Sequence, residues 1–177
     1  MRFADGPRTE CAIQIAAPAA RVWELVTDIA APAEFSPELM RAQWLTAEGV
    51  PALGARFAGY NRNRHLGEWR TVAEVVELVP ERAFGWAVLD VDGRFGPPAD
   101  DPERPVAVWR YSLEHRAGTT LLRQSVRLGP GRSGLTAAID RMPDLEEQLV
   151  VGRLDELRAG METTLRGIRA RAEDGTA

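Results

Sequence analysis

Apolar and polar side chains alternate along six stretches of the chain, and turn residues separate these stretches. The stretches are Leu39–Ala47, Ala55–Arg62, Glu68–Leu78, Ala83–Leu89, Val106–His115 and Thr119–Leu128. A period of two residues predicts β-strands, and a seventh short strand is predicted at Glu10–Ile15. Because the strands are short and no helical stretch lies between the six, we expect an antiparallel meander rather than a parallel sheet.

The alternation also assigns side chains to the two faces of the expected sheet. One face is apolar and carries Trp69, Thr71, Ala73, Val75, Phe84, Trp86, Val88, Trp109, Tyr111, Leu113, Leu122, Gln124, Val126 and Leu128. The other face carries charged residues such as Arg70, Glu74 and Arg110. This pattern is typical of a sheet covered on one side only. Three apolar residues interrupt the polar face, which a dimer or a protein partner would explain: Val72, Val76 and Leu121.

The other periodic segments have the spacing of helices. A short helix is predicted over Pro18–Ile29, where apolar residues recur every three or four positions, and Ala31-Pro32 ends it. Phe35–Glu38 is expected to be a short connector with room for one more helical turn. The last helix is the longest and covers Asp144–Ala172, again on gaps of three and four.

The long helix would span roughly 40 Å, which is enough to cross the whole sheet. Three glycines within it each cost about 1 kcal/mol relative to alanine, so packing must hold it: Gly152, Gly160 and Gly167. The order of elements predicts an α+β helix-grip fold. In it, a curved antiparallel sheet of about seven strands surrounds the long C-terminal helix, and two short helices follow the first strand. We expect one domain, residues 1–177, with a frayed tail at residues 173–177.

Composition and charge narrow the classes of function. The chain has 177 residues, of which 45% are hydrophobic and 27% charged, values that are ordinary for a globular domain. The net charge of −4 gives no electrostatic footprint for nucleic acid. All 22 basic residues are arginine, which excludes Schiff-base chemistry and suggests a GC-rich coding sequence. No apolar run is long enough to span a membrane, and the first ten residues lack a secretory signal, so a cytoplasmic location is predicted.

Candidate nucleophiles and metal ligands are few. Cys11 is the only cysteine, and its apolar surroundings favour a buried small hydrophobe over a nucleophile. His65 and His115 lie in or beside turns and form no metal-ligand pattern with it, so no metal and no cofactor are predicted. His65, with Glu68 nearby, could act as an acid or base at the mouth of a cavity, although a solvated turn is the simpler interpretation.

Four segments match the pattern of a known superfamily: Ile15–Asp28, Asn61–Trp69, Pro80–Trp86 and Trp109–Glu114. They resemble the START/Bet v 1-like (SRPBCC) superfamily and, within it, the bacterial polyketide cyclase/dehydrase-like branch. The resemblance covers about residues 9–171. It implies a cavity between the sheet and the C-terminal helix. Because the superfamily includes cyclases, lipid carriers and hormone receptors, it specifies the fold more closely than the function.

The resemblance also implies where a cyclase would carry its arginine. In aromatase/cyclase members, an arginine on the central strand is thought to help enolise and fold the polyketide. Aligned on Glu68-Trp69, its place falls at Ala73, so this chain departs from the cyclase pattern. Arg70 is nearby in sequence, but the alternation places it on the opposite face. The departure favours binding over catalysis, and no catalytic residue is assigned.

Ten residues are predicted to line the ligand cavity: Trp44, Phe57, Asn61, Trp69, Trp86, Trp109, Tyr111, Gln124, Leu149 and Leu157. A row of large aromatic side chains on one face suits a cavity, since a dry core more often uses Leu, Ile and Val. For each one alone, plain packing under the helix is the alternative. Asn61 and Gln124 interrupt the apolar face with amides, which need a ligand, water or solvent as a hydrogen-bond partner.

Two connections lie where they could cover such a cavity. Asp90–Arg104 is long and rich in proline, as an exposed flap would be, and Leu135, Ala138 and Ile139 suit a short amphipathic lid. The favoured hypothesis is the binding of a small hydrophobic molecule that is polyketide-, aromatic- or lipid-like. A polyketide cyclase/aromatase or dehydratase is the alternative, and a protein-interaction module is the second alternative. We expect no nucleic-acid partner, no membrane insertion, and a monomer or homodimer.

Overall fold

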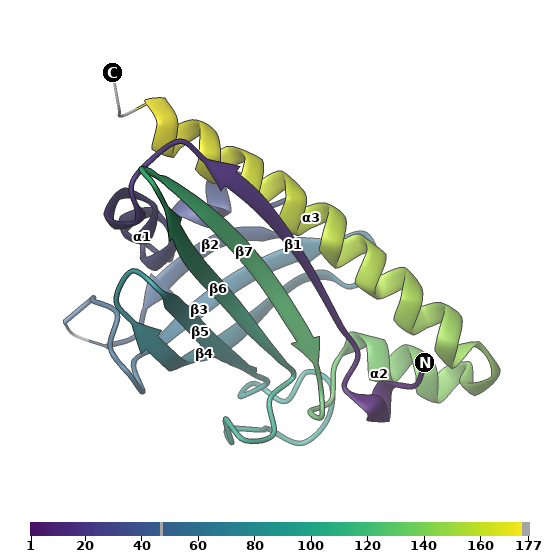
Figure 1. Ribbon diagram of the computed structural model, residues 1–177. Helices are drawn as coiled ribbons and strands as arrows, with labels where there is room; N and C mark the ends of the chain where they lie inside the picture. The colour runs from purple at the N-terminus through teal and green to yellow at the C-terminus, as the bar shows by residue number, and fades with distance from the viewer. Residues whose placement is uncertain (47, 175–177) are drawn as a thin grey trace.

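The computed structural model describes residues 1–46 and 48–174. Within them, strands and helices follow one another in the order shown in Figure 1. The strands are β1 (Arg8–Ile15), β2 (Leu39–Trp44), β3 (Arg56–Asn63), β4 (Gly67–Val79), β5 (Ala83–Leu89), β6 (Ala107–Arg116) and β7 (Thr119–Leu128). The helices are α1 (Ala19–Thr27), α2 (Gly134–Arg141) and α3 (Glu146–Asp174). Short 3₁₀ turns are η1 (Phe3–Asp5), η2 (Ala31–Glu34) and η3 (Pro143–Leu145).

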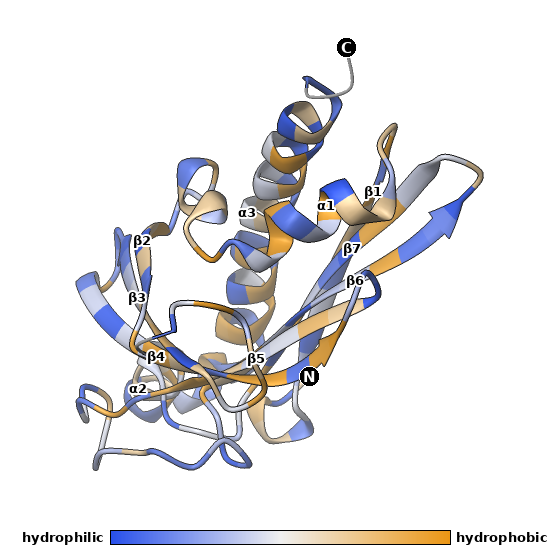
Figure 2. Cartoon of the chain, turned by 90° about the vertical axis from the view of Figure 1, so that its left-hand side faces the viewer, coloured by the Kyte–Doolittle hydropathy of each residue, from blue (hydrophilic) through white to orange (hydrophobic). Residues whose placement is uncertain are grey.

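The strands form one antiparallel sheet with the order β1-β7-β6-β5-β4-β3-β2. The consecutive strands β2 to β7 make the predicted meander, and β1 pairs with β7 at its far edge. The sheet curls, and α3 runs diagonally along its concave side next to β1, with α1 and η2 beside the helix (Figures 1 and 2). The α+β helix-grip prediction is therefore confirmed.

The core lies between the concave face of the sheet and α3. The helix buries the predicted apolar stripe, which comprises Val150, Leu154, Leu157, Met161, Leu165, Ile168 and Ala172. Leu145 and Leu149 follow the same spacing of three and four, but Leu149 is half-buried, and Leu145 is 39% exposed because it belongs to η3 and precedes the first turn of α3. Packing against the sheet thus begins one turn later than the sequence spacing indicates.

Some predicted boundaries differ from the observed ones. The first helix ends at Thr27 because Asp28 turns the chain: its side chain accepts a hydrogen bond from the Ala30 N–H, and its carbonyl accepts one from the Ala31 N–H. The additional helical turn is η2 rather than residues 35–38. Strand β2 ends at Trp44, and residue 47 of the predicted strand lies outside the described residues. Helix α3 continues to Asp174, and residues 175–177 of the predicted tail also lie outside that range.

A β-bulge interrupts β4, which the alternation did not predict. The register against β5 shifts between Val75 and Glu77. Val75 and Leu78 therefore both pack into the core, whereas Val76 is 43% exposed. Glu77 lies on the opposite face and accepts two hydrogen bonds from Arg110. A strict period of two would have placed Leu78 on the polar face.

The convex face is less open to solvent than predicted. Val72, assigned to this face, is only 3% exposed. Arg56 and Arg70 project from the same face and bind Asp100 and Asp92, respectively, in the connection between β5 and β6. These salt bridges hold part of that connection against the convex face. Coverage on one side only is therefore wrong here, and Val72 is not available to a partner.

Gly167 of α3 is required by packing rather than tolerated. A Cβ at this position would lie 2.2 Å from Cγ of Phe35, the residue that follows η2. At Gly152, by contrast, no atom lies within 4 Å of the corresponding Cβ position. The glycine costs predicted from sequence are therefore of two kinds. Gly167 lets the Phe35 ring pack close to the helix axis, whereas Gly152 has open space beside it.

We expect the same substitution to have opposite effects at the two positions. Gly152→Ala should raise the free energy of unfolding by about 1 kcal/mol through helix propensity. Gly167→Ala should lower it by about 1 to 3 kcal/mol, because the Phe35 ring must move out of its site. Urea unfolding measures both, and Gly160→Ala, whose Cβ would lie 3.4 Å from Pro37, is an intermediate control. A gain in stability at position 167 would contradict this packing.

Candidate functional site

A cavity of about 600 Å³ lies between the concave face of the sheet and α3. Strands β3 to β7 supply one wall and α3 the opposite wall. Helix α2, the segment from η2 to β2, and the hairpin between β3 and β4 complete its border. The fold therefore places the cavity where the helix stands away from the sheet.

Aromatic rings form the sheet side of the cavity. Trp86 and Trp109 are cross-strand partners on β5 and β6, and their rings stack with centroids 6.4 Å apart and planes at 7°. Tyr111 lies 5.6 Å and Phe57 6.2 Å from Trp86, centroid to centroid. Trp69 of β4 also lines the cavity. Alternate residues of neighbouring strands face the same side, so the sequence spacing brings these rings together.

The structure brings together nine of the ten residues predicted for the cavity: Phe57, Asn61, Trp69, Trp86, Trp109, Tyr111, Gln124, Leu149 and Leu157. Trp44 is not among the lining residues. It ends the edge strand β2, and its ring packs edge-on against Phe57 at 5.5 Å between centroids. Trp44 therefore supports the aromatic wall through Phe57 instead of facing the cavity.

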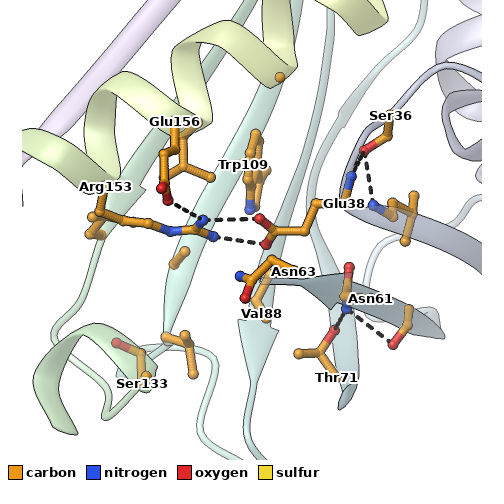
Figure 3. Close-up of a pocket in the computed structure, with 18 of the residues that line it drawn as sticks. Ser36, Glu38, Asn61, Asn63, Thr71, Val88, Trp109, Ser133, Arg153 and Glu156 are labelled. Atoms are coloured by element: carbon orange, nitrogen blue, oxygen red, sulfur yellow. Dashed lines mark hydrogen bonds and ion pairs between the residues drawn. The ribbon is translucent and has the colours of Figure 1, made fainter. Parts of the chain in front are cut away.

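The two amides of the apolar face differ in how well they are satisfied. Asn61 Nδ2 donates weakly, at 3.4 Å, to Gly59 O and to Thr71 Oγ1 (Figure 3). Gln124 is 5% exposed, and its buried Oε1 has no hydrogen-bond partner among residues 1–46 and 48–174. Such an unpartnered buried acceptor costs about 1 to 3 kcal/mol. Beside it, burial raises the pKa of Tyr111, so its phenol stays neutral.

An ion pair crosses the mouth of the cavity (Figure 3). Arg153 of α3 donates two hydrogen bonds to Glu38, from Nη1 at 2.9 Å and from Nη2 at 2.8 Å. Their side chains are 23% and 27% exposed. Burial opposes the charge on Arg153, but the hydrogen bonds and charge of Glu38 outweigh it and raise the arginine pKa above its usual value. The pair ties α3 to the segment that precedes β2.

Glu156, one turn further along α3, joins this pair to the β3–β4 hairpin. Its Oε1 lies 3.0 Å from Arg64 Nη2 and 3.2 Å from His65 Nε2, and its Oε2 lies 3.5 Å from Arg153 Nη1. Burial alone would raise the pKa of Glu156, but its hydrogen bonds with His65 and Arg64 and the charge of Arg153 hold it below its usual value. The carboxylate that contacts His65 is thus Glu156, whereas Glu68 lies 3.8 Å from Arg62.

The charged mouth of the cavity could hardly be predicted from the sequence. Arg153 lies three residues after buried Val150 and four before buried Leu157. That spacing places it at the border of the apolar stripe and is a usable signal. Its partner Glu38 lies 115 residues away in a segment without periodicity. The local sequence pattern cannot predict a contact between residues so far apart in the chain.

Helix α2 and the β3–β4 hairpin meet at one end of the cavity. Leu135 and Ala138 of α2 line it, as expected for the predicted lid. A Cβ on Gly134 would lie 2.7 Å from Cδ1 of Leu66, so the start of α2 presses directly on the hairpin. Arg94, from the connection after β5, donates a hydrogen bond to the Leu66 carbonyl. Three connections are therefore joined over this end of the cavity.

The other candidates for catalytic or metal-binding residues do not add a reactive group to the cavity. Ala73 lines the cavity, whereas Arg70 lies on the opposite face and binds Asp92. Cys11 is 8% exposed, and burial raises the pKa of its thiol to about 11, which keeps it protonated at neutral pH. Across residues 1–46 and 48–174, no cluster of His, Cys, Asp or Glu could hold a metal ion. No helix in that part of the chain is long and apolar enough to cross a membrane.

Fold and site together define a helix-grip protein with an aromatic cavity and a charged mouth. The family model described as polyketide cyclase / dehydrase and lipid transport matches residues 7–173. The chain belongs to this family. No protein among those with curated descriptions matches the sequence.

Solved structures agree with this assignment. A polyketide cyclase-like protein, Cgl2372 from Corynebacterium glutamicum, is 30% identical over 92% of this chain and 88% of its own, with a TM-score of 0.61. The Zhui aromatase/cyclase from Streptomyces sp. R1128 is 16% identical over 97% of this chain and 96% of its own, with a TM-score of 0.64. A START superfamily protein from Mycobacterium smegmatis is 15% identical over 96% and 98%, with a TM-score of 0.58. The last two show the fold alone.

Proposed function

We propose that this protein binds a small hydrophobic molecule, polyketide-, aromatic- or lipid-like, in the cavity between the sheet and α3. The observation that carries the proposal is a cavity of about 600 Å³ whose sheet side is built from aromatic rings. Small-molecule sites commonly measure 300 to 1,000 Å³ and combine apolar walls with a few placed polar groups. The family description, which includes lipid transport, supports the same function.

The ligand-contacting residues we propose are Phe57, Asn61, Trp69, Trp86, Trp109, Tyr111, Gln124, Leu149 and Leu157. Indole and phenol rings supply a large apolar area with few rotatable bonds, and their N–H and O–H groups supply direction. Trp44 acts indirectly, by holding Phe57 in place. The polar groups at the mouth would remain near solvent while the apolar part of the ligand lies deeper.

A cyclase or dehydratase is the second candidate, and one observation favours it. His65 and Glu156 form a hydrogen-bonded pair at the mouth, next to Arg153, and such a pair can transfer protons. Three structures with the same fold are described as aromatase/cyclases. Ala73 in place of the cyclase arginine counts against the enzyme. Turnover of a poly-β-ketone thioester that His65→Ala abolishes would favour catalysis over binding.

A ligand screen tests the proposed function. Bound molecules that contact Trp86 and Trp109 should change the intrinsic tryptophan fluorescence and raise the melting temperature. At a ligand concentration 100 times the Kd, the stabilisation is about 2.7 kcal/mol. For a chain of this size, that corresponds to a rise of about 5 to 10 °C. A broad library of hydrophobic metabolites without a single concentration-dependent shift in either signal would contradict the proposal.

A further inference from the structure

Four polar residues in the wall of the cavity are more than nine-tenths buried, and they divide into two pairs. Asp90 accepts hydrogen bonds from the backbone N–H groups of the following loop, and Thr164 donates one to a carbonyl of its own helix. Gln124 and Tyr111 have no such partners. Gln124 Oε1 is enclosed without a partner, and among the described residues neither the Gln124 amide nor the Tyr111 hydroxyl makes a hydrogen bond.

The unsatisfied pair is one structural unit. Tyr111 and Gln124 are cross-strand partners on β6 and β7, so their side chains stand next to each other on the concave face. They are 1% and 5% exposed, whereas the side chains of His65 and Glu156 at the mouth are 57% and 38% exposed and reach solvent. The pair therefore forms a neutral polar spot in the buried part of the wall, away from the ion pairs at the mouth.

The chemistry of this spot restricts its partner. The terminal torsion of a glutamine is broad and roughly two-fold, so either the oxygen or the nitrogen of Gln124 can turn to the cavity at little cost. The Tyr111 hydroxyl, held neutral by burial, both donates and accepts. Neither residue carries a charge, so a carboxylate or ammonium held by these two side chains would lack a counter-charge, which is strongly unfavourable. A hydroxyl group satisfies both residues at once.

We propose that Gln124 and Tyr111 form a recognition site for a hydroxyl group, and that the ligand is a neutral alcohol or phenol whose hydroxyl enters the cavity first. This inference rests on the proposed function, because it names the polar group of a cavity ligand. It deepens that function by fixing the orientation of the ligand. The apolar body then lies along the Trp86 and Trp109 rings.

Calorimetric titration with 2-naphthol and 2-methylnaphthalene tests the proposal, because the two probes differ by a hydroxyl against a methyl group of similar size. The wild-type protein should bind 2-naphthol about tenfold more tightly. Gln124→Met, which keeps the length of the side chain, should remove this preference by weakening 2-naphthol and sparing 2-methylnaphthalene. Tyr111→Phe is the second variant and should reduce the preference in the same direction.

The outcomes separate the two proposals. Equal affinities in the wild type, or a preference that persists in both variants, overturns the hydroxyl site and leaves the cavity function standing. Binding of neither probe counts against the cavity function and the hydroxyl site together. Stability gives an independent readout: Gln124→Met without ligand should melt at a higher temperature, because the unpartnered amide is gone. A lower melting temperature would mean that the amide is satisfied in the folded protein.

Discussion

Replacing Ala73 with phenylalanine is expected to lower the affinity for a cavity ligand at least about 100-fold, or about 2.7 kcal/mol. Ala73 lies in the middle of β4, between its cross-strand partners Phe57 and Val88, and all three line the cavity. A benzyl group at this position projects into the space that the ligand needs. Because that space is open, the added ring should cost less stability than overpacking a filled core does.

Titration of the variant with any ligand found by screening measures this effect. Val76→Phe is the matched control, since it places the same ring on the same strand but at an exposed position outside the cavity. We expect Val76→Phe to bind as the wild type does. Undiminished binding by a folded Ala73→Phe protein would show that the ligand does not occupy the cavity.

Replacing Arg153 with methionine is expected to lower the free energy of unfolding by about 2 to 3 kcal/mol. The change leaves the Glu38 carboxylate, 27% exposed, without its bidentate partner. Removing one member costs about 3 to 5 kcal/mol for a fully buried pair, whereas exposed pairs contribute about 0 to 1 kcal/mol. The partial exposure of this pair places it between these limits. The melting temperature should fall by about 5 to 10 °C.

Two further variants make the Arg153 result specific. Arg158→Met removes an exposed pair with Glu162 on the same helix and should cost under about 0.5 kcal/mol. Combining Arg153→Met with Glu38→Gln should recover part of the loss, because no unpaired charge then remains. If Arg153→Met and Arg158→Met lower the free energy of unfolding by the same small amount, the ion pair between Arg153 and Glu38 does not stabilise the fold.

Most of the fold could be predicted because the local pattern of apolar and polar residues identifies most of its strands and helices. Alternation over Thr119–Leu128 gave strand β7 with its observed bounds, and gaps of three and four located α3. The same period placed Trp86, Trp109 and Tyr111 on one face, and strand pairing then brought their rings into contact. Wherever the period is regular and one face is buried, the sequence is sufficient to predict the type of element and its buried face.

The parts that could not be predicted depend on contacts between distant segments. The bulge at Val75–Glu77 breaks the period, and nothing in the local sequence marks the break. The pair of Arg153 and Glu38 joins segments 115 residues apart. From the sequence, Gly167 only lowers the stability of the helix. The structure shows that a glycine is needed there, because the Phe35 ring packs against this position. The size of the cavity likewise depends on how far α3 stands from the sheet, which no local pattern encodes.

Fluorine NMR of protein labelled with 5-fluorotryptophan tests ligand binding in the cavity most directly. The chain has five tryptophans. Of these, Trp69, Trp86 and Trp109 line the cavity, whereas Trp23 of α1 does not. A saturating ligand should shift the resonances of the three cavity tryptophans and leave that of Trp23 unchanged. Binding that shifts Trp23 and leaves Trp86 and Trp109 unmoved would contradict a ligand site between the sheet and α3.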